Sequence, residues 1–339
     1  MTGAPTQRGA VIGLGMMGRH HARILQNHPA MLFAGAVDPA GDRHGVVSDD
    51  TQVHADIDAL LAAGPAPDFA VIAVPTEEHV AAASALAAAG VHVLIEKPLA
   101  PTVADAEQLT ATVEQAGVRA AVGHVERYNP ALLELRRRVN EGQLGEVFLI
   151  ATERVGPFPD RVKDVGVVKD LATHDLDLVR WLGGAAVERI SAETQHRMGR
   201  EHEDLVLAHG RLDNGRAFQC SVDWLTPTKV RQTRVLGERG MLVADTLTAD
   251  LTFFENAGVS TSGWSAIQAL RGVAEGDMTR YAFERREPLA VELETFAAYA
   301  AGDDDAAVVT LADGLETLAV AEACLASARD GETVRLAAR

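Results

Sequence analysis

Three side chains of this sequence have the types that oxidation of an alcohol requires. Lys97 directly follows the apolar run Val91–Ile95 and a glutamate, while Asp170 and His174 stand four residues apart in a segment with helical spacing. Residues four apart share one face of a helix, so Asp170 can orient the imidazole of His174 and stabilise its protonated form. A base of this kind is needed because the hydride leaves carbon only as the hydroxyl proton is removed.

The ordinary pKa values of these side chains favour His174 as the general base. A free lysine has a pKa of about 10.4 and a free histidine a pKa of about 6.5. Lowering the pKa of Lys97 to about 7 would therefore need a shift of roughly 3.4 units, or about 4–5 kcal/mol. The imidazole needs almost no shift. We therefore predict that His174 is the base and Asp170 its orienting partner. Lys97 is then the cation that lowers the pKa of the hydroxyl and stabilises the developing alkoxide.

A glycine-rich turn predicts a dinucleotide site. The hexapeptide Gly13-Leu14-Gly15-Met16-Met17-Gly18 follows one predicted strand and opens a predicted helix. In that context the first glycine permits a tight turn, the second lets a pyrophosphate approach the backbone, and the third allows helix–strand contact. The N-terminus of the helix attracts phosphate through its N–H groups. Cofactor contacts are predicted from Gly13, Gly15, Met16, Met17 and Gly18.

The next apolar run ends in an acidic residue that favours NAD as the cofactor. Asp38 stands twenty residues after the last glycine of the turn. Its carboxylate can accept hydrogen bonds from ribose hydroxyls and would repel a 2′-phosphate, although Arg43 nearby leaves NADP open. Four residues that follow later strand-like runs are expected to line the same pocket: Pro75, Thr76, Glu96 and Lys97.

The first 125 residues alternate short apolar runs with alanine-rich helical stretches. Near-continuous apolar runs are typical of parallel strands that are covered on both faces. The predicted strands are Ala10–Gly13, Leu32–Val37, Phe69–Val74, Val91–Ile95 and Arg119–Gly123. The predicted helices between them are Met17–Gln26, His79–Ala89 and Ala104–Ala116. This alternation predicts an α/β fold with a doubly wound parallel sheet.

After Asn129 the pattern changes to closely spaced strand-like runs, with a strong hairpin signal at Asp213-Asn214-Gly215 and another at Gly237–Gly240. The predicted strands are Val147–Val155, Glu188–Gln195, Leu205–Leu212, Ala217–Trp224, Val230–Leu236, Met241–Ala244 and Leu251–Glu255. The predicted helices are Ala131–Asn140, Asp170–Leu182, Leu289–Ala300 and Leu311–Ala328. We therefore predict a Rossmann domain over residues 1–124. An α+β domain with a large, mainly antiparallel open sheet follows over residues 125–339 and binds the substrate.

Composition excludes several classes of protein. The chain has 339 residues, 48 acids against 31 Lys and Arg, and a formal charge of −17, so we expect no binding to nucleic acid or to an anionic membrane. Its two cysteines, Cys220 and Cys324, form no disulfide framework, and we expect neither a signal peptide nor a membrane span, hence a cytoplasmic protein. The spacing of His196, His202 and His209 fits no metal site, so no metal is expected.

These motifs together resemble the Gfo/Idh/MocA oxidoreductases, which are NAD(P)-dependent sugar and cyclitol dehydrogenases. The resemblance extends to the late stretch from Arg286 through Glu292 and Phe296, so it covers nearly the whole chain. In that family the lysine of E-K-P and the aspartate and histidine of D-x-x-x-H are the catalytic set, and here they are Lys97, Asp170 and His174. One departure is Ala172, where the family often has glycine, which changes backbone freedom rather than chemistry.

A narrower resemblance, to the UDP-N-acetylglucosamine 3-dehydrogenase subgroup, implies oxidation of the sugar 3-hydroxyl to a ketone. It rests on the stretches Gly123–Pro130, Arg154–Pro159, Asp164–Val167 and Trp224–Lys229. Basic side chains suit a diphosphate, because arginine pairs with phosphate through two hydrogen bonds and lysine acts as a point charge. The predicted substrate ligands are Arg127, Tyr128, Asn129, Arg154, Arg161, Lys163 and Lys229.

Three other functions stay open from the sequence. One is a dehydrogenase of inositol or another free polyol, for which the basic residues have no use. Another is an NADP-dependent sugar 3-ketoreductase, which Asp38 disfavours. A third, from a different class, is a dinucleotide-binding regulator without catalysis, which need not keep Lys97 or His174. We also expect a homodimer or homotetramer formed through the second sheet, since strands such as Ala217–Trp224 carry apolar residues on both faces.

Overall fold

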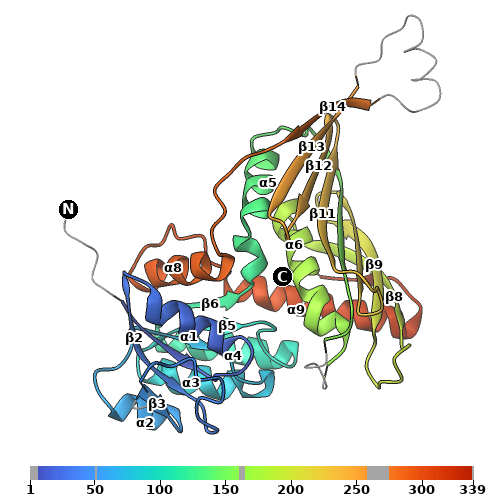
Figure 1. The fold of residues 1–339 in the computed structure, drawn as a ribbon. Helices are drawn as coiled ribbons and strands as arrows, with labels where there is room; N and C mark the ends of the chain where they lie inside the picture. The colour runs from blue at the N-terminus through green and yellow to red at the C-terminus, as the bar shows by residue number, and fades with distance from the viewer. Residues whose placement is uncertain (1–6, 50–51, 160–164, 258–274, 338–339) are drawn as a thin grey trace, which may run out of the picture. The chain divides into compact units, whose positions relative to one another are not determined.

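The structure is a computed structural model that describes residues 7–49, 52–159, 165–257 and 275–337. It divides into two compact units, drawn in Figure 1. The first unit comprises Met1–Val125 and Glu287–Leu318, and the second comprises Glu126–Arg286 and Ala319–Arg339. The predicted boundary between two domains, after residue 124, stays a prediction. The structure adds that Glu287–Leu318, late in the chain, packs in the first unit rather than in the second.

The first unit is built on a six-stranded sheet with the order β3-β2-β1-β4-β5-β6, and all of its strand pairs are parallel. Its strands are β1 (Gln7–Ile12), β2 (Met31–Val37), β3 (Val53–His54), β4 (Phe69–Ile72), β5 (His92–Glu96) and β6 (Ala120–Gly123). Its helices include α1 (Gly18–Asn27), α2 (Ile57–Ala62), α3 (His79–Ala88), α4 (Val103–Ala116) and α8 (Pro288–Ala300). The strand order reverses between β1 and β4, where ligands bind in folds of this type.

The core of the first unit explains why α8 belongs there. All four residues of β4 are buried, and Phe69 makes an edge-on contact with Phe296 of α8 with ring centroids 5.7 Å apart. Leu289, Leu293 and Phe296 join the apolar cluster of α1 and the sheet. Removing these side chains from water stabilises the unit by roughly 1.5–3 kcal/mol each, which is enough to hold a late segment of the chain on an early sheet.

The second unit contains a nine-stranded sheet with the order β14-β13-β12-β11-β7-β10-β9-β8-β15. The strands are β7 (Val147–Val155), β8 (Val187–Gln195), β9 (Leu205–Leu212), β10 (Ala217–Asp223), β11 (Val230–Gly237), β12 (Gly240–Asp245), β13 (Asp250–Asn256), β14 (Glu275–Arg280) and β15 (Val334–Arg335). Every described pair is antiparallel except β7 with β10. Both predicted hairpin turns lie where expected, between β9 and β10 and between β11 and β12, and the predicted fold class is confirmed.

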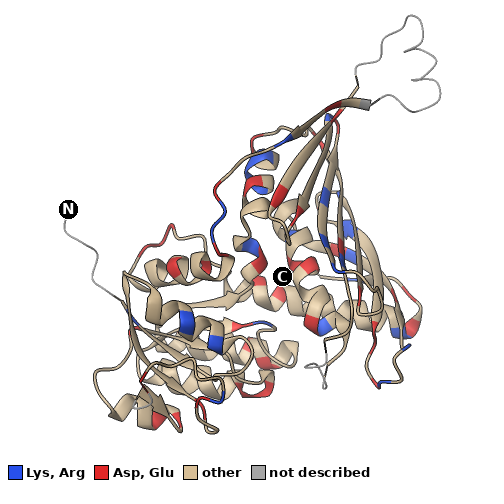
Figure 2. Cartoon of the chain, in the orientation of Figure 1, with Lys and Arg blue, Asp and Glu red and all other residues tan. Residues whose placement is uncertain are grey.

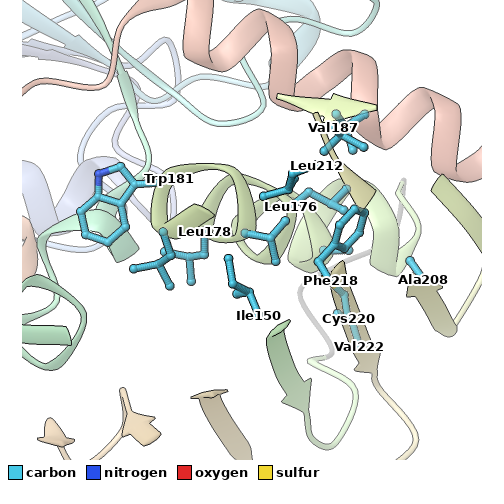
Figure 3. Packing of buried hydrophobic residues seen from close by; sticks show 14 of the residues in the cluster. Ile150, Leu176, Leu178, Trp181, Val187, Ala208, Leu212, Phe218, Cys220 and Val222 are labelled. Atoms are coloured by element: carbon cyan, nitrogen blue, oxygen red, sulfur yellow. The ribbon is translucent and has the colours of Figure 1, made fainter. Parts of the chain in front are cut away.

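Helices α5 (Pro130–Asn140), α6 (Thr173–Gly183) and the later part of α9 (Leu311–Asp330) pack with this sheet. Figure 3 shows Leu176 and Leu178 of α6 among Ile150 of β7, Leu212 of β9 and Phe218 of β10. The predicted helix over Asp170–Leu182 is not regular throughout, because Val168–Ala172 forms a π-helical turn before α6 begins. Such turns open the helix locally, and they occur frequently at functional sites.

Candidate active site

The glycine turn after β1 has a backbone that other residues would disrupt. Gly13 has a φ of +92°, and a Cβ there would lie 2.6 Å from the carbonyl oxygen of Ala73. A Cβ on Gly18 would lie 1.8 Å from the carbonyl oxygen of Gly13. Gly15, in contrast, faces open space, so packing within the protein does not require a glycine there. Close approach of a ligand to the backbone is the remaining physical reason for it.

Helix α1 begins directly after this turn and carries no side-chain cap at Met17. A ligand at this end therefore meets backbone N–H groups and the positive end of the helix dipole. The turn thus fits the pyrophosphate of a dinucleotide. A nicotinamide dinucleotide bound there would supply the acceptor for hydride.

Asp38 follows β2 and is half-buried. Its carboxylate accepts hydrogen bonds from the N–H of Leu14, in the glycine turn, at 2.9 Å and from the N–H of Ala40 at 2.8 Å. Asp38 therefore holds the turn in place as well as presenting a negative charge. The predicted contact with a ribose stays a prediction.

A cavity of about 400 Å³ lies beside Asp38 within the first unit. Its walls come from the ends of β1 and β2 and from α2 and α3, and they are mostly apolar with three carboxylates among the lining residues. The lining residues are Ile12, Val37, Pro39, Ala55, Asp56, Ile57, Asp58, Val74, Glu78, Ala81, Ala82 and Ala85. An apolar slot of this size suits a flat aromatic group such as a nucleobase, while its carboxylates disfavour an added phosphate.

The turn after β5 carries Lys97, which is half-buried. The side chain of the preceding Glu96 folds back, so that its Oε2 accepts the backbone N–H of Lys97 at 3.3 Å and its Oε1 lies 2.8 Å from Nε2 of His21. The Lys97–Pro98 bond is cis. His21, which the sequence did not single out, is fully buried and ties α1 to this turn.

His79 is a second buried histidine that the sequence did not single out. Its two ring nitrogens lie 3.2 Å from the carbonyl oxygens of Val74 and Leu99, which follow β4 and β5. Burial lowers the pKa of His79 below the ordinary histidine value, and the neutral ring can donate to only one of these two carbonyls at a time. The predicted cofactor residues Pro75 and Thr76 stand in the loop after β4, exposed and half-buried respectively.

In the second unit, Asp170 lies in the π-helical turn and His174 is the second residue of α6. Both side chains are half-buried. Their expected partnership stays a prediction. The turn nevertheless places both of them within five residues of backbone at the start of one helix.

Two buried ion pairs hold α6 in place. Arg127 donates from Nε and Nη2 to the carboxylate of Asp177 at 2.7 and 2.6 Å, and Arg154 donates to Asp175 at 2.6 Å and to Glu126 at 2.8 Å. Burial opposes the charge of Arg154, but Asp175 and Glu126 outweigh it and raise the pKa of the guanidinium above its usual value. Both arginines were predicted to bind substrate. Their observed partners are carboxylates of the protein, and contact with a substrate stays a prediction.

The other predicted substrate ligands differ in their surroundings. Tyr128 is buried, and the Asn129 side chain caps α5 at the N–H of Ala131 and donates to the carbonyl of Thr246. Lys229 is exposed, and Arg161 and Lys163 lie outside the described residues. Figure 2 shows basic and acidic residues interspersed along the elements of the second unit, which agrees with the pairing of its arginines.

The described residues contain no group of three His, Cys, Asp or Glu side chains arranged to hold a metal ion. Within the same residues, no helix combines the length and the apolar character that crossing a membrane requires.

Two family models match this chain, one within each of its two units. The family model described as "Oxidoreductase family, NAD-binding Rossmann fold" matches residues 7–124, and the model of the GFO/IDH/MocA C-terminal domain matches residues 132–243. The chain is 30% identical to UDP-N-acetylglucosamine 3-dehydrogenase of Acidithiobacillus ferrooxidans over 85% of its length and 87% of that protein. It is 29% identical to inositol 2-dehydrogenase 1 of Saccharopolyspora erythraea over 98% of its length and 96% of that protein.

Solved structures agree with these matches. UDP-N-acetylglucosamine 3-dehydrogenase GnnA from Acidithiobacillus ferrooxidans is similar with a TM-score of 0.81 at 26% identity, over 96% of this chain and 98% of that one. GenD2 from gentamicin A biosynthesis, in complex with NAD, is similar with a TM-score of 0.78 at 25% identity, over 98% and 97% of the two chains. The chain therefore belongs to the Gfo/Idh/MocA family and is an NAD(P)-dependent oxidoreductase that acts on CH–OH groups.

Proposed function

We propose that this enzyme oxidises a secondary hydroxyl of a nucleotide sugar to a ketone with NAD, and that its substrate is UDP-N-acetylglucosamine, oxidised at C3. The observation that carries the proposal is the 30% identity, over 85% of the chain, to a protein named for that reaction. The chain also keeps the residue types that the reaction needs, with Lys97 at the end of β5 and His174 at the start of α6.

The chemistry assigned to the chain's own residues is a proton transfer and a charge stabilisation. His174 takes the hydroxyl proton, while the hydride leaves the same carbon for the nicotinamide. Asp170 orients the imidazole and stabilises it once it is protonated. The Lys97 ammonium stabilises the alkoxide that forms as the proton leaves.

The buried pairs on α6 support the base in this scheme. Asp175 and Asp177 stand one and three residues after His174, and each is held by a buried arginine. A base that must meet a substrate hydroxyl gains from a fixed helix, because small displacements cost much of the rate. We assign Arg127 and Arg154 this positioning role within the proposal, beside their predicted role in substrate binding.

Asp38 supports NAD over NADP. Its carboxylate and the carboxylates that line the neighbouring cavity would repel a 2′-phosphate. Arg43 is exposed nearby and is the residue that would have to compensate in an NADP enzyme.

A second candidate is oxidation of a free cyclitol. Inositol 2-dehydrogenase 1 aligns with 98% of this chain, a larger share than the nucleotide-sugar enzyme does. Two of the arginines expected to bind a diphosphate are also engaged with carboxylates. A free polyol needs neither of those arginines.

An absorbance assay of NADH formation separates the two candidates. UDP-N-acetylglucosamine, free N-acetylglucosamine and myo-inositol are supplied in parallel with NAD. A signal with the nucleotide sugar alone supports the proposal, whereas a signal with myo-inositol or the free sugar replaces it with the second candidate. His174→Ala and Lys97→Ala are expected to lower turnover severely while NAD binding, measured by fluorescence, is nearly kept.

We further propose, as expected from the sequence, that the enzyme is a cytoplasmic homodimer or homotetramer assembled through the second sheet. Several strands of this sheet carry exposed apolar side chains, among them Phe148 of β7, Leu207 of β9 and Phe254 of β13. Light scattering at micromolar concentration tests the proposal, and a monomer there would contradict it.

A further inference from the structure

The π-helical turn Val168–Ala172, which carries Asp170 and leads into His174, has no side-chain cap of its own. Val167, the residue before it, makes no capping hydrogen bond with its side chain. The first N–H groups of a helix have no acceptor within that helix, and buried N–H groups need one. Val167 and Val168 are both 0% exposed, so solvent does not supply it. The acceptors must come from another part of the chain.

Both acceptors belong to Glu203, in the loop of residues 196–204 between β8 and β9. Its backbone carbonyl accepts the N–H of Val167 at 3.0 Å, and its carboxylate oxygen Oε1 accepts the N–H of Val168 at 3.0 Å. Glu203 is itself buried. A carboxylate suits this place because it interacts favourably with the positive end of a helix and forms a stronger hydrogen bond than a neutral acceptor. Glu203 therefore caps the turn from 35 residues further along the chain.

Gly166 makes room for this carboxylate. A Cβ at residue 166 would lie 2.0 Å from Oε1 and 2.1 Å from Cδ of Glu203. Gly166 has no positive φ, so the conformation of its backbone does not require a glycine. The space that the carboxylate occupies is the reason for the missing side chain. The carbonyl of Gly166 also accepts the N–H of Asp170 at 3.1 Å, so the same residue connects Glu203 to the predicted catalytic aspartate.

The loop that supplies Glu203 is fixed to the second sheet. The next residue, Asp204, donates its N–H to the carbonyl of Gln195 at 2.8 Å and accepts the N–H of Trp224 at 2.9 Å, which ties the loop to the ends of β8 and β10. Arg200 of the same loop donates to the carbonyl of Val165 at 2.9 Å. The segment before the π-helical turn is thus held by a loop that is itself anchored at both neighbouring strands.

We propose that Glu203 is a positioning residue of this oxidoreductase, whose carboxylate fixes the π-helical turn and with it Asp170 and His174. The inference rests on the roles that the proposed function gives to those two side chains. Glu203 acts through the backbone of Val168 and not on the reacting atoms. A neutral acceptor of the same shape can replace the carboxylate, whereas loss of the acceptor leaves a buried N–H unsatisfied. The turn can then move, and small displacements of a base cost much of the rate.

Three variants separate this role from general stability. Glu203→Gln keeps an acceptor of the same shape, and Glu203→Ala removes it. Gly166→Ala keeps the carboxylate in the chain but displaces it, because the new Cβ would overlap with it. Asn214→Ala is the matched control, since the Asn214 side chain donates to the carbonyl of Gly183 at 2.9 Å, at the opposite end of α6.

The first readout is the exchange of the Val168 N–H with D₂O. The sequence has three Val-Val pairs, so protein labelled with ¹⁵N and carbonyl ¹³C in valine gives three signals in an HNCO spectrum, from Val47, Val168 and Val309. Val46→Ile and Val308→Ile each remove one of the other two signals and so assign that of Val168 without a change in the turn. The Val47 and Val309 signals come from the first unit and serve as internal standards.

We expect the Val168 N–H to exchange about tenfold faster, or more, in Glu203→Ala and in Gly166→Ala, and within about threefold of the wild-type rate in Glu203→Gln and Asn214→Ala. Gly166→Ala should add little in the Glu203→Ala background, because the nearest atoms that its Cβ would meet are then gone. An unchanged exchange rate in Glu203→Ala overturns the proposal. So does an effect of Gly166→Ala that is as large without the carboxylate as with it.

The second readout is turnover, and it alone depends on the proposed function. Glu203→Ala should lower kcat about tenfold with the KM for NAD unchanged, and Glu203→Gln should keep kcat within about threefold of the wild type. Asn214→Ala should keep the wild-type kcat. A kcat in Glu203→Ala no lower than that in Asn214→Ala refutes the positioning role. If the wild type oxidises none of the sugars offered, the proposed function fails, while the exchange of the Val168 N–H still decides whether Glu203 holds the turn.

Discussion

The pair formed by Arg127 and Asp177 offers a quantitative test of what holds α6. The guanidinium donates two parallel hydrogen bonds, at 2.7 and 2.6 Å, to one carboxylate. The side chains are 9% and 1% exposed. Replacing Asp177 by asparagine keeps the shape and removes the charge, so that Arg127 is left as a buried cation without its counter-ion.

Breaking a buried pair from one side costs about 3–5 kcal/mol, whereas an exposed pair contributes about 0–1 kcal/mol. The second unit has about 180 residues. At roughly 2–4 °C per kcal/mol for a unit of that size, Asp177→Asn should lower its Tm by roughly 6–20 °C. Asp330→Asn is the matched control, since the Arg329–Asp330 pair is 72% and 51% exposed, and it should leave the Tm nearly unchanged.

Tryptophan fluorescence during urea and thermal unfolding is a suitable assay, because Trp181 and Trp224 lie in the core of the second unit. The double variant Arg127→Met with Asp177→Leu should be more stable than Asp177→Asn, since it leaves no buried charge unpaired. If Asp177→Asn is as stable as Asp330→Asn, the pair does not hold α6 and the positioning argument is refuted.

Three further predictions concern the first unit. Asp38→Ala should weaken NAD binding about tenfold and reduce the ratio of the affinity for NAD to the affinity for NADP. Fluorescence titration with both nucleotides measures the two affinities. Gly18→Ala should abolish NAD binding in calorimetry, because its Cβ would lie 1.8 Å from the carbonyl oxygen of Gly13; retained affinity would show that the turn adapts. Burial, and secondly the charge of Glu96, raise the folded-state pKa of Glu292, so its stabilising contribution is complete below the unfolded value of about 4.5 and falls as the pH rises toward the folded value. In the wild type, the unfolding free energy should therefore fall with pH by up to about 1.4 kcal/mol per pH unit, and Glu292→Gln should lose this dependence. Calorimetric unfolding of both proteins at several pH values measures it. If the unfolding free energies of the wild type and Glu292→Gln change in parallel with pH, the prediction is wrong.

The elements that depend on local pattern were predictable. The apolar runs of the first sheet and the glycine turn are short-range signals, and the observed β2, β5 and β6 begin and end within one or two residues of the expected positions. β3 was missed because two residues have no periodicity. The return of α8 to the first unit was not predictable, since it follows from packing of Phe296 on Phe69, more than two hundred residues apart.

The functional side chains divide in the same way. The position of Lys97 at the end of a buried strand could be predicted from the strand alone. The partners of the buried charges could not, because they are distant in sequence: His21 meets Glu96 across 75 residues, and Arg127 meets Asp177 across 50. A histidine or arginine without a nearby acid in the sequence therefore looks like an ordinary helix residue or an available ligand until the fold supplies its partner.

This has a direct consequence for the choice of substrate. The case for a diphosphate began with basic residues in an acidic chain, and the fold engages Arg127 and Arg154 with carboxylates. Among the described residues of the predicted set, Lys229 is the basic side chain that is exposed. A nucleotide sugar should therefore lose affinity in Lys229→Met, whereas a cyclitol should not. Since one solvated lysine contributes less than a buried arginine clamp, the diphosphate argument depends on the particular place of Lys229 rather than on the number of basic residues.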